Sequence, residues 1–279
     1  MRLCDSNPIE VYNGSNLSAM PKLLADGRIP MSVSKLMNYR INESDKFPDW
    51  KNNWFDTSDL ILYGSKSDGK VKFVLTVDKN GKITENGKEA LELINPHSQR
   101  SSGAIELSQN LYNKFKGIEV AVGNLGRTGS RMPKEEILGN RAWRILSRHP
   151  DEVPAEFAED SNLLKEYSKW VSNQTGSNEN MGVYINSLSK SPKLRAGYVS
   201  GLEYGSNANG WFDLDYDSGR LVGLAPEAHG NIIKPISGRA LSVEEILKES
   251  SQTNVFAQDQ INKFQSILEE KGYEIGRKN

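Results

Sequence analysis

Alternating apolar and polar positions predict a β-meander in the first third of the chain. Residues 60–63 (LILY) and 71–77 (VKFVLTV) have the composition of strands, and in the second run the apolar residues fall on one face. Asn80-Gly81 is a two-residue hairpin signal that turns the chain back on itself. Residues 60–85 are therefore predicted to form antiparallel strands.

Strands are also predicted towards both ends of the chain. Residues 9–16 (IEVYNGSN) read as a strand that runs into a turn. Residues 211–224 (WFDLDYDSGRLVGL) show the clearest hairpin signal, because Asp217-Ser218-Gly219 is typical turn chemistry between two apolar runs.

Apolar residues at helical spacing predict helices between and after these strands. The predicted helices are residues 19–26, a segment after Ser32 or Ser34, residues 88–94, 103–116 and 154–174, a helix opened by a capping box at residues 242–245, and residues 254–271. Residues 42–57 are polar and include Trp50, Trp54 and Phe55, which predicts an ordered surface loop packed by its aromatic side chains. This order of elements favours an α+β fold, with an antiparallel sheet or meander, packed helices and a helical C-terminus.

The most unusual stretch is residues 118–150, where an apolar strand, a glycine-rich loop and a basic helix are predicted in succession. Glycines recur at every third position of the loop, and Thr128 and Ser130 flank the last of them. Glycine adopts positive φ and lets backbone N–H groups approach a ligand closely. Such a loop at the start of a helix makes a concave site for an anion.

Arginines strengthen this hypothesis, because guanidinium groups bind phosphate with paired N–H bonds. Arg141, Arg144 and Arg148 follow one another at spacings of three and four, so a helix would place them on one face. The candidate phosphate-binding residues are Gly123, Gly126, Arg127, Thr128, Gly129, Ser130, Arg131, Arg141 and Arg144. The alternative is structural: the glycines serve a turn, and the arginines form a solvated face that pairs with carboxylates.

The opening segment, residues 11–30 (VYNGSNLSAMPKLLADGRIP), resembles the first strand and helix of ADP-ribosyltransferases. Tyr12, Gly14 and Ser15 match position by position, and Asn13 stands where that family has the His or Arg that holds NAD. The resemblance covers about twenty residues, within a strand–turn–helix pattern. It implies NAD binding beside this strand, and an NAD-using transferase as one possible activity.

Other candidate chemistry is sparse. Asp213, Asp215 and Asp217 alternate, so on a strand they would share an acidic face or, alternatively, begin a site for a hard cation such as Ca²⁺ or Mg²⁺. His97 lies in a loop with no partner carboxylate that the sequence can place, and the spacing of the three histidines predicts no metal site. No catalytic residue and no cofactor are predicted from these patterns.

Composition limits the classes of protein that remain. The 279 residues carry 35 basic and 36 acidic side chains, so the near-zero net charge gives no general attraction to nucleic acid or anionic membrane. No stretch approaches the roughly 20 apolar residues of a membrane span. Cys4 has no partner for a disulfide within the chain, which favours a reducing compartment and a cytoplasmic location. A single domain over 1–279 is predicted, with a possible sub-boundary near 173–180.

Three functions stay open. The first is the binding of a phosphorylated ligand, a nucleotide or nucleic-acid phosphate, at the glycine- and arginine-rich loop. The second is a non-catalytic interaction or self-assembly protein, which would dock a protein partner or a second copy through the aromatics of residues 47–55 and the acidic edge at residues 213–217. The third is the NAD-using transferase.

Overall fold

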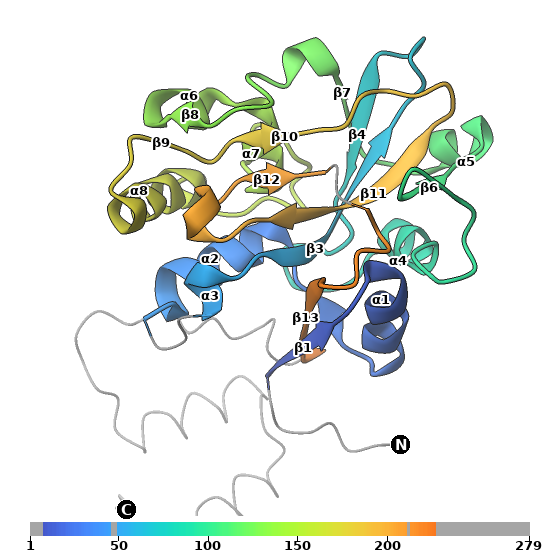
Figure 1. The fold of residues 1–279 in the computed structure, drawn as a ribbon, viewed down its shortest axis with the longest axis horizontal. Coiled ribbons are helices and arrows are strands. Elements are labelled where there is room, and N and C mark those ends of the chain that lie inside the picture. The colour runs from blue at the N-terminus through green and yellow to red at the C-terminus, as the bar shows by residue number, and fades with distance from the viewer. Residues whose placement is uncertain (1–7, 46–48, 211–212, 227–279) are drawn as a thin grey trace, which may run out of the picture. The chain divides into compact units, whose positions relative to one another are not determined.

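The chain folds around one long strand, β3 (Phe55–Tyr63), in which every residue is buried. The structure is a computed structural model, shown in Figure 1, and it describes residues 8–45, 49–210 and 213–226. These residues belong to one compact unit, Met1–Asn231, and the predicted sub-boundary near 173–180 lies inside it. The helices predicted at residues 242–245 and 254–271 lie outside the described residues.

Both helices and strands are present in number, which confirms the predicted α+β class. The strands are β1 Ile9–Asn13, β2 Ile29–Pro30, β3, β4 Lys70–Val74, β5 Arg100–Ser101, β6 Ala104–Glu106, β7 Ile118–Ala121, β8 Met132–Pro133, β9 Glu179–Asn180, β10 Val183–Tyr184, β11 Lys193–Val199, β12 Ala208–Asn209 and β13 Arg220–Leu224. The helices are α1 Asn16–Ala25, α2 Val33–Glu43, α3 Asp49–Asn52, α4 Glu85–Glu92, α5 Gln109–Lys114, α6 Lys134–Gly139, α7 Arg141–Leu146 and α8 Leu163–Thr175, with 3₁₀ turns η1 Val122–Asn124 and η2 Leu202–Tyr204. Among the described residues, none of these helices has the length and apolar character to cross a membrane.

The main sheet is mixed, and its central path runs β1-β13-β3-β11-β12-β10. Strand β11 pairs antiparallel with β3 from Lys193 opposite Tyr63 to Val199 opposite Phe55. The other edge of β3 pairs antiparallel with β4, and β4 in turn pairs with β7. The predicted meander is therefore confirmed for β3 and β4, and β3 begins five residues earlier than the LILY run.

Side chains of β3 enter two separate cores because a strand directs successive residues to opposite faces. Leu60 and Leu62 pack with α1 and α4 on one face, whereas Ile61 and Tyr63 join the larger core on the other. Figure 1 shows α1, α4 and α5 towards one side of the view and α2 and α8 towards the other, with α7 near β10 and β12. Two-sided burial explains why this segment reads as a continuous apolar run rather than an alternating one.

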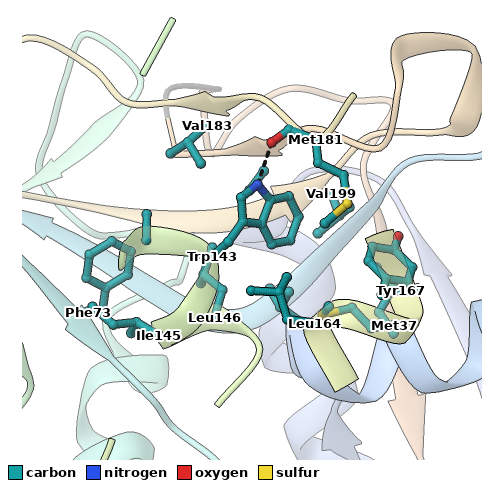
Figure 2. Packing of buried hydrophobic residues seen from close by; sticks show 14 of the residues in the cluster. Met37, Phe73, Trp143, Ile145, Leu146, Leu164, Tyr167, Met181, Val183 and Val199 are labelled. Atoms are coloured by element: carbon teal, nitrogen blue, oxygen red, sulfur yellow. Dashed lines mark hydrogen bonds between the residues drawn. The ribbon is translucent and has the colours of Figure 1, made fainter. Parts of the chain in front are cut away.

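Trp143 of α7 is the largest side chain of the bigger core and is fully buried. Figure 2 shows it packed among side chains from α2, α8 and the sheet, with its indole N–H donating to the backbone oxygen of Met181 at 2.5 Å. A buried indole needs such a partner because an unsatisfied N–H costs free energy. This bond ties α7 to the segment between β9 and β10.

Several predicted elements are confirmed by local signals. Helix α2 begins after Ser32, whose hydroxyl accepts the Lys35 N–H at 3.3 Å, as an N-cap residue does. Strand β1 and helix α1 follow the predicted strand–turn–helix order, with the helix starting three residues earlier than expected.

Three predictions are wrong. The hairpin predicted over residues 211–224 does not form within its described part, residues 213–224, because β13 pairs with β1, β2 and β3 instead of with the residues before the turn. The helix predicted over 103–116 begins only at Gln109, and β6 takes the earlier residues into the sheet beside β11. The surface loop at 42–57 contains the end of α2, α3 and the start of β3, with Trp50 only 6% and Phe55 only 4% exposed.

Candidate functional site

The glycine-rich loop reaches a helix only after a short strand, since α6 begins at Lys134 directly after β8. It runs from η1 through Gly126 and Gly129, which have φ of 92° and 80°, into the short strand β8. The Gly129 N–H donates to the Val183 oxygen at 2.8 Å, and a Cβ at Gly126 would lie 2.7 Å from the Asn140 amide nitrogen. Gly126 therefore serves close packing within the chain, and Gly129 a backbone turn with positive φ. Gly123, Thr128 and Ser130 belong to the same loop, where Gly123 and Ser130 are exposed.

The single basic helix predicted after the loop is also wrong. Asn140 ends α6 and caps α7, its side chain accepting the Trp143 N–H at 3.1 Å. Asn140 favours such a cap because its side-chain oxygen satisfies a free N–H of the next helix. Arg148 lies beyond α7 with a φ of 62° and is buried, so it does not continue a face with Arg141 and Arg144.

The arginines that the structure places near one another are already paired with acids. Arg141 and Arg144 both contact Glu152, at 3.0 and 3.3 Å, and Arg144 also contacts Asp151 at 3.0 Å. Arg127 pairs with Glu136 at 2.8 Å. Of the two alternatives stated for these arginines, this geometry matches the carboxylate-paired surface. Phosphate binding stays a prediction, now without free guanidinium groups at these three positions.

Arg131 differs from these residues. It lies on a polar pocket of about 300 Å³ together with residues of α8, of the turn that follows it, and of η2. The pocket residues are Arg131, Gln174, Thr175, Ser177, Asn180, Leu202 and Glu203. The guanidinium donates to the backbone oxygen of Glu203 at 3.4 Å. Among the described residues, no acidic side chain forms an ion pair with it.

A second feature gathers aromatic side chains from distant parts of the chain. Trp54 lies edge-on to Tyr198 of β11 at 5.6 Å between ring centroids and against Tyr216 at 5.9 Å. Tyr216 is 47% exposed, and Tyr204 of η2 is 57% exposed. We call these four residues the aromatic face. Turn η2 lies beside it, since Gly201 packs against the backbone oxygen of Asn52, two residues before Trp54.

Buried Arg40 fixes the backbone beneath this face. Its guanidinium donates to the backbone oxygens of Trp50 and Asn53 at 2.9 Å each, and to the Ser206 hydroxyl at 2.8 Å. It therefore joins the loop before Trp54 to the turn after Tyr204. Each of these is a hydrogen bond from a charged donor, which is stronger than a neutral one.

The acidic residues near Tyr216 lie in a turn, not on a strand. Asp213 pairs with Arg195 at 3.1 Å and Asp215 with Arg100 at 3.0 Å. The Leu214 N–H donates to the Gly103 oxygen at 2.8 Å, which ties the turn to the β5–β6 hairpin. The acidic edge is thus held by arginines. No group of three or more possible metal ligands occurs within residues 8–45, 49–210 and 213–226.

The residues that resemble an ADP-ribosyltransferase have structural partners here. The Tyr12 hydroxyl donates to Asp26 at 2.9 Å, and burial raises the pKa of that hydroxyl above its ordinary value. The Gly14 N–H donates to the Gly219 oxygen at 2.9 Å, and its φ of 116° needs glycine. Ser15 precedes α1 as its N-cap residue. NAD use stays a prediction.

Sequence reasoning noticed Trp54 but not its partners. Tyr216 is 162 positions further along the chain and Tyr198 is 144, so no local spacing could connect them. The alternation of residues 213–217 suggested a strand and drew attention to the acids rather than to the tyrosine between them.

No known protein family matches the sequence, and no curated protein matches it either. A solved structure described as "Accommodation of massive sequence variation in Nanoarchaeota by the C-type lectin fold" superposes with a TM-score of 0.56. The match covers 80% of this chain and 100% of the other, at 14% sequence identity. The chain has a C-type lectin fold. At this identity the likeness extends to the fold alone.

Proposed function

We propose that this protein is a non-catalytic binding protein that contacts a polypeptide ligand through the aromatic face. The carrying observation is that Trp54 contacts Tyr198 edge-on and Tyr216 at a tilt, which brings together rings from three distant segments, with Tyr216 about half exposed. Tyrosine and tryptophan give large, rigid and amphipathic contact area, which is why they are enriched at the centres of protein interfaces. Exposed apolar surface of this kind marks interaction sites, and in this cluster it is supplied by Tyr216, which the more buried Trp54 and Tyr198 support.

The distribution of exposed apolar side chains supports this choice of surface. Among the described residues, the large hydrophobic side chains that are well exposed are Val11, Tyr204 and Tyr216. Two of the three lie in the segments that follow β11 and β12: Tyr216 packs against Trp54, and Tyr204 belongs to η2, the turn that follows Gly201 beside the Asn52 backbone. Exposed hydrophobic side chains that are scattered singly over a surface are normal, whereas exposed side chains on two neighbouring segments indicate an interaction site.

The backbone of this face is held from below, while Tyr204 and Tyr216 are exposed to solvent and Tyr198 is buried. Arg40 ties the turn at Ser206, and Arg195 with buried Leu214 ties the turn at residues 213–217. Glu203, Tyr204 and Tyr216 are exposed, so their replacement does not disturb either anchor. The fold neighbour is described as accommodating massive sequence variation. An anchored turn with outward side chains supports the same property in this chain.

We expect Tyr204→Ala and Tyr216→Ala to leave the fold intact. Each should change the free energy of unfolding by no more than about 0.5 kcal/mol, because neither side chain fills the core. Denaturant unfolding monitored by tryptophan fluorescence would measure this. A loss of several kcal/mol at either position would show that these tyrosines support the fold rather than a ligand.

The function itself can be tested with peptides selected from an unbiased displayed library against the full chain. Peptides that bind best should lose about tenfold or more in affinity towards the double variant Tyr204→Ala/Tyr216→Ala, which corresponds to about 1.4 kcal/mol. Val11→Ala is the matched control, since it removes an exposed apolar side chain on the edge strand β1. Peptides that bind the double variant as well as the wild type would refute the proposal.

The ligand can also be a second copy of the chain. In that case light scattering should show a dimer for the wild type and a monomer for the double variant. Phosphorylated ligands and NAD stay the other candidate ligands. A cytoplasmic location also stays a prediction. An unchanged melting temperature in the presence of mononucleotides, NAD and RNA oligomers would remove both ligand classes.

A further inference from the structure

The polar pocket at Arg131 adjoins the aromatic face through η2, which contributes Glu203 to the pocket and Tyr204 to the face. We infer that this pocket receives the carboxylate of an acidic side chain on the polypeptide ligand. The inference rests on the proposed function and adds a chemical requirement for the ligand: an Asp or Glu next to the residues that contact the tyrosines.

The state of the Arg131 guanidinium is the first support. Arg127, Arg141, Arg144 and Arg148 each form an ion pair within the chain. Arg131 makes one hydrogen bond, of 3.4 Å, to a backbone carbonyl, and no acid among the described residues pairs with it. Its planar set of donors therefore stays available to a carboxylate, which guanidinium binds in a bidentate manner.

The remaining walls show which other groups can donate. Thr175 and Ser177 use their hydroxyls on the backbone oxygens of Val171 and Glu179, at 2.9 and 3.0 Å. The Asn180 amide donates to the Ser177 oxygen at 2.8 Å. These bonds make the turn after α8 a rigid wall. The exposed amide of Gln174 has no hydrogen-bond partner among the described residues, so it is the second available donor.

Charge selects a carboxylate over a phosphate. The pocket holds one cation, Arg131, and one acid, Glu203, with no ion pair between them. A singly charged carboxylate would be balanced by Arg131. A phosphate carries about −1.5 to −2 charges near pH 7 and would be repelled by Glu203. Arg131 is also one of the residues predicted to bind phosphate, but the acid beside it in this pocket favours a carboxylate there instead.

The test uses the full chain and three small probes. N-acetyl-glutamate N-methylamide supplies the carboxylate without free termini, N-acetyl-glutamine N-methylamide is its uncharged match, and inorganic phosphate is the competing anion. NMR titration should show shifts of the Arg131 Nε–H and of the backbone amide of Ser177 with the glutamate probe. The glutamine probe and phosphate should cause shifts only at concentrations at least about tenfold higher.

Arg131→Gln should abolish these shifts, with an unchanged melting temperature showing that the variant is folded. Arg127→Gln is the matched control, because Arg127 is also exposed but is paired with Glu136. Equal binding of the glutamate and glutamine probes, tighter binding of phosphate, or shifts that persist in Arg131→Gln would each overturn the inference. The peptide selection measures the contribution of Tyr204 and Tyr216 to binding. A negative result of the probe titration at Arg131 would therefore not change the outcome of the peptide selection.

Discussion

Asp59→Leu should lower the free energy of unfolding by about 3–5 kcal/mol, the largest loss expected from one substitution in this chain. Asp59 and Arg148 form an ion pair at 3.1 Å in which each side chain is only 1% exposed. The other Asp59 oxygen accepts the Val33 N–H at the start of α2, at 2.7 Å. Removing the carboxylate leaves a buried guanidinium without its counter-charge, which costs more than the pair contributes.

A double variant separates this effect from simple loss of packing. Arg148→Met removes the stranded charge, so Asp59→Leu/Arg148→Met should lose at least about 1.5 kcal/mol less than the sum of the two single variants. Lys88→Ala is the control for an exposed pair, since its ammonium lies 3.9 Å from Glu92 on the surface of α4. That substitution should matter by under about 0.5 kcal/mol. Additive losses in the double variant would contradict a coupled buried pair.

The second large effect is a dependence of stability on pH that originates at Asp56. Burial raises the pKa of this carboxyl to about 7, although hydrogen bonds from the Asn16 amide and the Arg220 N–H act in the opposite direction. No described Lys or Arg forms an ion pair with it. The folded chain therefore keeps this proton at pH values where the unfolded chain, with a pKa near 3.8, has released it.

The sign of the effect follows from that difference. As pH rises from about 4 to about 7, the free energy of unfolding should fall, by up to about 1.4 kcal/mol for each unit by which the pKa is raised. Above about pH 7 the contribution of Asp56 should become constant. Urea unfolding at a series of pH values measures it. In Asp56→Asn this slope should become smaller, since Glu159, whose pKa burial also raises, still contributes with the same sign. In the exposed control Asp217→Asn the full slope should persist. A slope that is unchanged in Asp56→Asn would contradict the assignment.

The Asn16 side chain can follow the change in charge. Its amide nitrogen donates to Asp56 at 3.0 Å, while its amide oxygen has no hydrogen-bond partner in the described chain. Rotation of the amide would present that oxygen to a protonated Asp56, or to the side-chain amide nitrogen that Asp56→Asn introduces. The variant should therefore fold at every pH at which the wild type is folded.

The sequence predicted the elements whose signals are local. The hairpin of β3 and β4 follows from apolar runs at a short separation, and α2 follows from the cap at Ser32. The failure at residues 211–224 has a physical cause: a turn signal says that the chain reverses, not which strand it joins afterwards. Here β13 pairs with β1, whose residues precede it by about 210 positions, and local patterns carry no such information.

The candidate site also combines features with local sequence signals and features that depend on long-range contacts. The arginine spacing was real, but Glu152 lies close enough along the chain to neutralise Arg141 and Arg144, and the break at Asn140 turned Arg148 inward. The aromatic face depends on contacts across more than 140 residues, so only the folded chain could show it. Arg131 differs from the other arginines of this region because no described acid forms an ion pair with it. The absence of an ion pair is a property of the folded chain and cannot be predicted from the sequence.

Because β3 is buried on both faces, its register with β11 and β4 is determined by its polar residues, 56–59. A one-residue shift in the register of β3 would exchange Leu60 and Leu62 with Ile61 and Tyr63, and both faces of the strand would still be hydrophobic. The same slip would carry Asp59 away from Arg148 and the Thr57 hydroxyl away from the Gly197 oxygen, which it meets at 2.8 Å. A β3 strand in the wrong register would therefore be destabilised by buried polar groups without partners. The apolar residues of β3 stabilise the sheet but do not determine the register.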